Sequence, residues 1–306
     1  MNYAANWWKD FARTHENLKH SIAGAGAGIV SSIVTCPLDV VKTRLQNQGK
    51  LEPGMIVYRG TVGTLSRIWK EEGIRGLYRG LGPMLVGYLP TWAIYFTVYD
   101  YCKGRWTGQL GQPGRDWTLH IASAMTAGAA STSLTNPLWV IKTRFMTQSE
   151  RTAYRYNNTL HAFATIAKEE GIRGFYKGLG PSLIGVSHVA VQFPLYEKLK
   201  TWFHTQANVP SGTLVILLAS SLSKMAASTA TYPHEVIRTR LQNQTRKPFK
   251  YHGIIHAIKV ITVEEGIRGF YKGMSTNLIR TVPSSAMTIL TYEVIVEKLD
   301  NIKKYG

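Results

Sequence analysis

The stretch "PLDVVKTR" occupies residues 37–44 of the 306-residue chain, and near copies of it recur twice. Residues 137–144 read "PLWVIKTR" and residues 233–240 read "PHEVIRTR". Each copy is followed by a phrase of the type "EEGIRGFYKG" and then by an aromatic residue next to an acid. Three marks in one fixed order, repeated about every 100 residues, predict three related modules around a pseudo-threefold axis. The expected repeats are 1–110, 111–206 and 207–306.

Charge-poor stretches occur twice in each repeat, and each is close to the ~20 residues that an α-helix needs to cross a bilayer. These stretches are 22–41, 80–99, 117–141, 178–196, 212–237 and 273–292. They predict an all-α membrane protein with six transmembrane helices in three pseudo-symmetric repeats. Strongly basic loops alternate with less basic ones, and an even number of helices then places both termini on the less basic side.

The composition narrows the classes of partner. The formal net charge of +18 favours anionic partners such as nucleotides, anionic lipid or nucleic acid. A nucleic-acid-binding repeat protein would carry its bases on one soluble face, whereas here they mark the ends of apolar helices. Two cysteines form no disulfide framework and match no zinc spacing, and the chain shows no phosphate loop or nucleophile–base pair of an enzyme. The first 19 residues lack the features of a cleaved leader.

The repeated proline phrase brings opposite charges together. An acid two residues after the proline and a base five residues after it share one face of a helix, and charges at membrane depth face a cavity and pair there. We therefore expect a ring of ion pairs made by Asp39, Lys42, Lys142, Glu235 and Arg238. Trp139 replaces the acid of the second copy, which would leave Lys142 without its in-register partner. Snorkelling side chains at the helix ends are the alternative.

These motifs resemble those of the mitochondrial carrier family over nearly the whole chain. The resemblance implies a six-helix bundle with short helices on the matrix side, which works by alternating access in the mitochondrial inner membrane. The ion-pair ring would then close the matrix side, with Gln46 and Gln242 as braces and Met146 in the third brace position. The opposite, cytosolic gate would be formed by Asp100, Lys103, Glu197, Lys200 and Glu293, with Val296 where a sixth charge is expected.

The same resemblance places the substrate halfway down the central cavity. It assigns contact positions to Gly87, to the pair Gly185 and Val186, and to Arg280. Lys224 lies nine residues before Pro233, which is two and a half turns above the gate on one helix, and Trp92 and His188 complete the expected lining. Trp139 either stacks on a planar ring of the substrate or acts as a packing wedge.

Finer phrases resemble the branch of the family that carries pyrimidine nucleotides, folate or FAD, and NAD, and most closely the fungal-type NAD carriers. We therefore expect exchange of NAD for adenine nucleotides, with pyrimidine nucleotides or FAD and folate as the alternative. No cofactor, metal or nucleic-acid partner is expected, and the protein should be a monomer with its termini in the intermembrane space. Cardiolipin is expected at three motifs: Tyr78, Arg79 and Gly80; Tyr176, Lys177 and Gly178; and Tyr271, Lys272 and Gly273.

Overall fold

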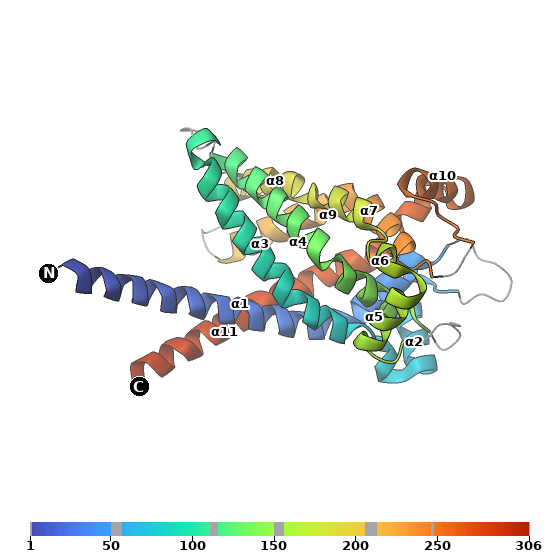
Figure 1. Cartoon of the computed structure of the whole chain (residues 1–306), viewed down its shortest axis with the longest axis horizontal. Coiled ribbons are helices and arrows are strands. Elements are labelled where there is room, and N and C mark those ends of the chain that lie inside the picture. Colours follow the sequence, from blue (N-terminus) through green and yellow to red (C-terminus); the bar gives the residue numbers. More distant parts are fainter. Residues whose placement is uncertain are drawn as a thin grey trace. The chain divides into compact units, whose positions relative to one another are not determined.

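The structure, a computed structural model, describes residues 2–49, 57–110, 116–149, 156–205, 213–245 and 248–305. Every regular element in these ranges is a helix (Figure 1), so the all-α expectation is confirmed for this part of the chain. The long elements are α1 (Asn2–Asn47), α3 (Leu81–Leu110), α4 (Asp116–Thr147), the pair α7 (Leu179–Val186) and α8 (His188–Thr205), α9 (Thr213–Gln242) and α11 (Met274–Tyr305). The short elements are α2 (Gly60–Leu77), α5 (Thr159–Glu169), α6 (Gly171–Phe175), α10 (Ile254–Glu265) and the 3₁₀-helix η1 (Ile267–Tyr271).

Each of the six charge-poor stretches is thus largely helical. By length and hydropathy alone, two helical stretches among the described residues are long and apolar enough to cross a membrane, Ala23–Asn47 and Leu81–Thr107. The second of these is 17% buried, and it exposes large apolar side chains such as Val86 and Leu89. An apolar helix that is mostly exposed is not the buried core helix of a water-soluble protein.

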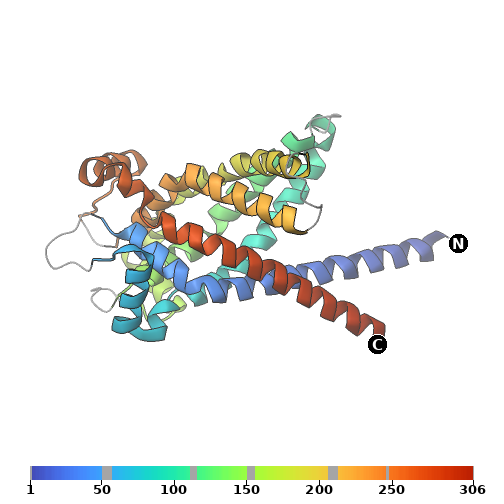
Figure 2. The same cartoon turned by 180° about the vertical axis from the view of Figure 1, so that it is seen from behind.

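The chain divides into two compact units, Met1–Thr35 with Arg280–Gly306, and Cys36–Ile279. In the first unit, segments from the two ends of the chain cross (Figure 2). The hydroxyl oxygens of Ser31 and Ser284 lie 3.1 Å apart at this crossing. A Cβ atom at Gly26 would lie 2.6 Å from Cδ1 of Ile295, so glycine permits the close approach of the two helices.

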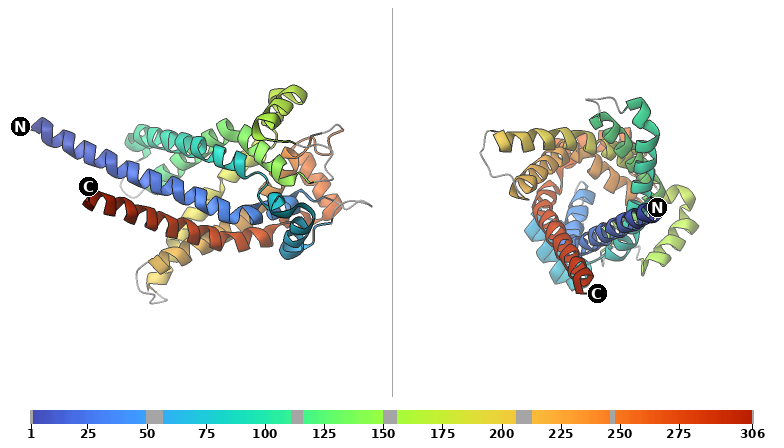
Figure 3. Two further views of the ribbon diagram at one scale, coloured as in Figure 1. Left: turned by 90° about the horizontal axis from the view of Figure 1, so that it is seen from below. Right: turned by 90° about the vertical axis from the view of Figure 1, so that its left-hand side faces the viewer.

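The larger unit is built from helix pairs. Helix α3 packs on α4, α8 packs on α9, and α7 contacts both α4 and α9. The short helices α2, α5 and α10 lie at one end of the long helices of this unit (Figures 1 and 3). In each repeat the short helical segment bends at a glycine with positive φ, at Gly73, Gly171 and Gly266, a conformation that costs glycine little.

The three repeated prolines do not end their helices, because α1, α4 and α9 continue through Pro37, Pro137 and Pro233. Three further glycines hold each repeat against its neighbour. Gly80, Gly178 and Gly273 have φ values of 86°, 74° and 82°. A Cβ atom at these glycines would lie 3.0 to 3.1 Å from the carbonyl oxygens of Lys142, Arg238 and Lys42. Glycine is therefore required here both by its φ and by the space available.

The fourth charge-poor stretch is not one continuous helix, as had been expected from composition. It divides at Ser187 into α7 and α8. The N–H of Ser187 bonds to the carbonyl of Ile184, and the N–H of Ala190 bonds to that of Ser187, both at 3.0 Å. These are i to i+3 bonds of the 3₁₀ type, which rise about 2.0 Å per residue rather than 1.5 Å. The tighter turn lets this stretch, one residue shorter than the second one, span a similar length.

Candidate functional site

An ion pair joins the first and third proline phrases. Nζ of Lys42 lies 2.5 Å from Oε2 of Glu235, and the two side chains are 12% and 28% exposed. Lys42 also donates a hydrogen bond to Oδ1 of Asn277 at 2.8 Å. Because this pair is partly buried, water screens it less than it screens a surface pair.

Gln46 bonds to the same ion pair. Its Nε2 donates to Oε2 of Glu235 at 3.2 Å and to the hydroxyl of Tyr232 at 3.0 Å. Its Oε1 accepts a hydrogen bond from Thr239 at 2.9 Å. Such a side chain ties α1 to α9 alongside the ion pair, which is the geometry required of a brace.

The other two brace positions bond differently. Gln242 accepts a hydrogen bond from the hydroxyl of Thr143 at 2.8 Å. Met146 occupies the remaining position, and its Sδ lies 3.6 Å from the hydroxyl oxygen of Thr43. A thioether is a weak acceptor with no donor, so this position cannot bridge an acid and a base as Gln46 does.

Trp139 fills the place of the missing acid with an indole ring. Its Nε1 donates to Oγ1 of Thr135 at 3.1 Å, and its ring meets that of Tyr88 edge-on with centroids 6.4 Å apart. The ammonium of Lys142 lies 5.0 Å from the centre of the indole, within the range of a cation–π interaction. In the structure the indole therefore packs, while stacking on a substrate stays a prediction.

The ion pair between Lys42 and Glu235 indicates which base would face position 139. The base of the first repeat, Lys42, pairs with the acid of the third, Glu235. The same rotation would pair Lys142 with Asp39 and would place Arg238 opposite position 139. Within the described residues Arg238 forms no ion pair, and of the acids only Glu235 exerts a marked attraction on it. We therefore expect position 139 to face Arg238, while the expectation that Lys142 lacks its in-register acid stays a prediction.

A second set of charges, repeated three times, lies next to the ring and was missed in the sequence. The last arginine of each proline phrase is buried and forms a forked ion pair with the second glutamate of "EEG": Arg44 with Glu72, Arg144 with Glu170 and Arg240 with Glu265. The Nε of each arginine also donates to a backbone carbonyl of the next repeat, at Met146, Gln242 and Gln46, each at 3.0 Å. Fixed spacing in all three copies was the signal that could have revealed this set.

Two of these glutamates, Glu170 and Glu265, are held as carboxylates by their basic partners. Burial alone would raise the pKa of Glu170, but hydrogen bonds from Arg144 and Lys177 outweigh burial and lower that pKa. The pKa of Glu265 is lowered in the same way, against the effect of burial, by Arg240 and Lys272. The pairs of Glu170 with Arg144 and of Glu265 with Arg240 therefore remain ionised at neutral pH, and all three arginine–glutamate pairs bind a proline-containing helix to its neighbour.

The bases of the expected lipid motifs point into this network. Arg79 lies 2.9 Å from Glu72, Lys177 lies 2.6 Å from Glu170, and Lys272 lies 2.6 Å from Glu265. Tyr176 and Tyr271 are exposed. The structure thus accounts for the bases through ion pairs within the protein, and binding of cardiolipin at these motifs stays a prediction.

The residues of the expected cytosolic gate are arranged differently from the ring. Asp100 and Lys103 lie exposed on α3, and Glu197 lies exposed on α8. Lys200 is 5.9 Å from the ring centre of Tyr196. Among the described part of the larger unit, these charges form no ion pair with one another. Glu293 belongs to the smaller unit.

Some of the expected substrate residues lie at contacts between helices, and others belong to a cluster of polar side chains. Gly87 is buried against Leu138 of α4, and a Cβ atom at Gly185 would lie 2.5 Å from Nε2 of His234. Val186 packs on Gly128. At these positions the small residue permits close packing of the helices. Their role as a flat surface for the nucleotide base of a substrate stays a prediction.

The cluster of polar side chains is formed by residues of α8 and α9. His188 of α8 is half-buried. Its imidazole interacts electrostatically with the charged side chains of Glu235 and Lys224 on α9. His234, which follows the proline of the third phrase, also acts on His188 and was missed in the sequence. Trp92 is half exposed and stacks on Phe96 with centroids 5.5 Å apart. Arg280 belongs to the smaller unit.

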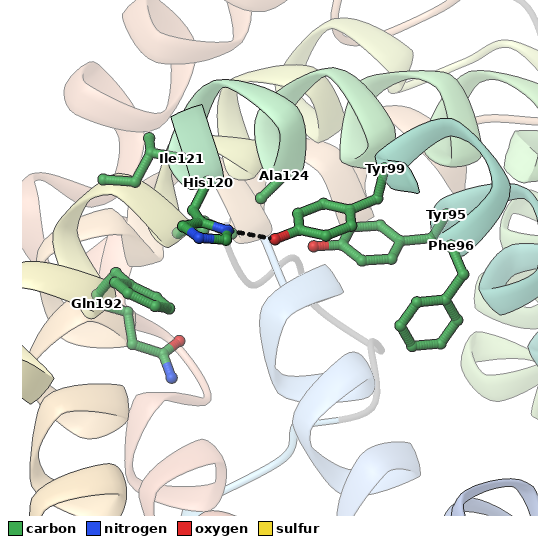
Figure 4. Close-up of a pocket in the computed structure, with 9 residues that line it drawn as sticks. Tyr95, Phe96, Tyr99, His120, Ile121, Ala124 and Gln192 are labelled. Carbon is green, nitrogen blue, oxygen red and sulfur yellow. Dashed lines mark hydrogen bonds between the residues drawn. The ribbon is translucent and has the colours of Figure 1, made fainter. Parts of the chain in front are cut away.

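A pocket of about 410 Å³ opens between α3, α4 and α8 (Figure 4). Its lining includes Tyr95, Tyr99, His120 and Gln192. Tyr99 is the aromatic residue next to Asp100 in the first repeat, and the other three residues were not singled out in the sequence. The hydroxyl of Tyr99 hydrogen-bonds to Nδ1 of His120 at 2.7 Å. The spacing of Tyr95 and Tyr99, four residues apart on one helix face, was the available signal.

The comparison with protein families agrees with this architecture. The family model described as "mitochondrial carrier protein" matches residues 13–110, 114–207 and 210–303, in three consecutive copies. The chain belongs to the mitochondrial carrier family.

Several named relatives match this carrier over most of its length. It is 45% identical to mitochondrial nicotinamide adenine dinucleotide transporter 1 of Saccharomyces cerevisiae, over 92% of this chain and 77% of that protein. It is 45% identical to the mitochondrial nicotinamide adenine dinucleotide transporter 2 of Arabidopsis thaliana, over 94% and 81%. A chloroplastic transporter of the same dinucleotide from Arabidopsis thaliana is 44% identical, over 91% of each chain. These relatives are transporters rather than enzymes.

Proposed function

We propose that this carrier exchanges NAD for adenine mono- or dinucleotides across the mitochondrial inner membrane by alternating access. The observation that carries the proposal is the 44–45% identity, over more than nine-tenths of the chain, to three transporters named for that dinucleotide. Two of the three are named as mitochondrial, which supports the location.

Six transmembrane helices in the three repeats 1–110, 111–206 and 207–306 form the transport unit of this proposal. Both termini lie in the intermembrane space, and the protein acts as a monomer. The apolar, mostly exposed face of α3 supports contact with lipid. The engaged pair of Lys42 and Glu235 supports a state that is closed toward the matrix, as does the lack of ion pairs, among the described residues, between the cytosolic-gate charges on α3 and α8.

The substrate site of the proposal combines Lys224 and Arg280 as phosphate-binding bases. Two bases suit the two phosphate charges of a dinucleotide, and the forked guanidinium of Arg280 suits phosphate oxygens. Gly87, Gly185 and Val186 are the contact positions assigned to the nucleotide base in this proposal, while Trp92 and His188 supply aromatic and polar surface. An intramembrane arginine is costly unless it serves such a role.

The test is uptake of labelled NAD into liposomes that contain the purified protein and are loaded with AMP or NAD. We expect exchange by the wild type, near-complete loss in Arg280→Ala, and partial recovery in Arg280→Lys, because lysine keeps the charge but loses the fork. Arg173→Lys, at an exposed position on α6, is the matched control and should exchange normally. Strong exchange of UTP or FAD without NAD would refute the substrate while leaving the carrier assignment intact.

A further inference from the structure

We propose that the pocket between α3, α4 and α8 binds the nicotinamide ring of NAD, outside the substrate residues assigned above. This inference rests on the proposed function and adds a second contact area for the same substrate. The pocket volume of about 410 Å³ lies within the range of about 300–1,000 Å³ that is typical of ligand pockets. It can hold one end of a dinucleotide rather than all of it.

The first argument is the arrangement of the aromatic rings. Tyr95 and Tyr99 stack with centroids 6.1 Å apart and planes 12° apart, and Tyr99 and His120 are nearly parallel at 19°. Figure 4 shows the three rings in a row, with the hydrogen bond between Tyr99 and His120 fixing their order. Pre-oriented parallel faces favour a flat ligand ring that continues the stack.

The second argument is the charge of the lining. The pocket is lined by Tyr95, Phe96, Tyr99, His120, Ile121, Ala124, Val189, Gln192 and Phe193. None of these is a lysine, arginine, aspartate or glutamate, so the pocket offers phosphate no charged partner. The electron-rich faces of tyrosine rings attract cations, and the oxidised nicotinamide ring carries a positive charge whereas adenine is neutral.

The third argument is the single amide in the lining. Gln192 carries both an acceptor oxygen and a donor nitrogen, and its side chain is part of the pocket lining (Figure 4). The carboxamide of nicotinamide has the complementary acceptor and donor, so the two amides can form a pair of hydrogen bonds. An aliphatic residue at 192 would leave that carboxamide unpaired when water is excluded.

The experiment compares KM for NAD⁺, NADH and AMP in the liposome exchange assay. In Tyr99→Leu we expect KM for NAD⁺ to rise at least about fivefold, the lower end for loss of a base–aromatic stack. KM for AMP should stay within about twofold, since AMP has no nicotinamide. NADH, whose ring is neutral, should lose less affinity than NAD⁺. Tyr99→Phe keeps the ring and should retain a KM for NAD⁺ near that of the wild type.

The matched control is Tyr101→Leu, because Tyr101 lies on the same helix, is 71% exposed and is not part of the pocket. Gln192→Leu gives an independent test that leaves the stacked rings intact, and it should raise KM for NAD⁺ but not for AMP. Unfolding temperatures in detergent identify any variant that fails to fold. An equal rise for AMP and NAD⁺ would assign the pocket to adenine and overturn the proposal, as would an unchanged KM for NAD⁺. A wild type that exchanges neither NAD⁺ nor NADH would instead refute the proposed function.

Discussion

A single residue, Trp139, decides how strongly the ring of charges can close. Lys42 and Glu235 show the pairing direction, and by the same rotation position 139 lies opposite Arg238. The indole uses its N–H on Thr135 and packs its edge on Tyr88. A full ring would hold three interhelical pairs, so in the proposed mechanism the replacement would remove one of them and weaken the closed state.

We expect Trp139→Asp to restore that pair and to slow exchange. A partly buried ion pair worth about 1 kcal/mol in the closed state would slow its opening roughly fivefold. The check is the initial rate of nucleotide exchange in liposomes together with the unfolding temperature, which should rise. Trp139→Asn removes the indole without adding charge and is the control. Equal rates in the Asp and Asn variants would show that packing, rather than charge, governs this position.

At the scale of single residues, the sequence repeat predicted which positions carry the charges of the ring, but not which side chains pair with one another. Asp39, Lys42, Glu235 and Arg238 could be proposed from spacing, because acid and base three residues apart share a helix face. Which base meets which acid depends on the order of helices in space, and spacing along one helix does not contain that information. The expectation for Lys142 therefore stays a prediction, and within the described residues Arg238 forms no ion pair.

At the scale of elements, buried arginines hold the short helices to the long ones. The guanidinium of Arg144 contacts Glu170, the hydroxyl of Tyr156 and the carbonyl of Gln242. One side chain thus joins α4, the short helical segment of its own repeat and α9. A planar fork with five donors can satisfy all three acceptors, whereas an ammonium cannot match this geometry.

We expect Arg144→Lys to lower the unfolding temperature by about 5 °C, from a loss of about 2 kcal/mol in charged hydrogen bonds. The exposed Arg173→Lys should leave the temperature unchanged, because its side chain lies outside the network. Scanning calorimetry or fluorescence in detergent provides the measurement. An equal temperature for Arg144→Lys and wild type would show that charge alone, without the fork, holds these helices.

The same pairs predict how stability depends on pH. Folding lowers the pKa values of Glu170 and Glu265, so the unfolded chain binds protons more readily. Their contribution to stability is complete above the ordinary carboxyl pKa and is lost as the pH falls through the lowered values. The unfolding temperature should therefore decrease below about pH 5, and this decrease should be smaller in Glu170→Gln. An equal acid decrease in that variant would assign the effect to other carboxylates.

Element boundaries show where composition was sufficient and where it was not. The length of the stretches with few charged residues was enough to locate the long helices, because a helix that spans lipid needs about 20 apolar residues. Composition gave no sign of the break at Ser187. Its trace in the sequence was a difference in length, because the stretch from Gly178 to Glu197 is one residue shorter than the equivalent stretch from Gly80 to Asp100. The pocket residues Tyr95, Tyr99, His120 and Gln192 come from three helices, so only packing in space brings them together.

At the scale of the whole molecule, both gates of the proposed mechanism would be incomplete. The matrix ring lacks an acid at Trp139, and the cytosolic set has Val296 where a further base is expected. Each closed state of an alternating-access carrier must be weak enough to open, and a substrate can drive the change only by its differential affinity for the two states. A carrier with two weakened gates is thus suited to a substrate that binds without a triphosphate.

Lipid is the remaining partner at this scale, and its site can be separated from the ion pairs. Helix α3 begins one residue after Gly80 and α11 one residue after Gly273, and the first N–H groups of a long helix attract phosphate. Arg79, Lys177 and Lys272 already pair with glutamates inside the protein. Backbone N–H groups, rather than these bases, should therefore hold the two phosphates of cardiolipin.

We expect cardiolipin to raise the unfolding temperature in detergent more than phosphatidylglycerol, which has one phosphate, and phosphatidylcholine, which has no net charge. Lys177→Gln removes the pair with Glu170 and should lower the temperature by a similar amount with and without cardiolipin. Loss of the cardiolipin effect in that variant would show that Lys177 itself binds the phosphate. A wild-type protein that responds equally to all three lipids would refute the site. The comparison separates two roles of one motif. Lipid binding would use the backbone N–H groups, whereas the attachment of the short helices uses the basic side chains.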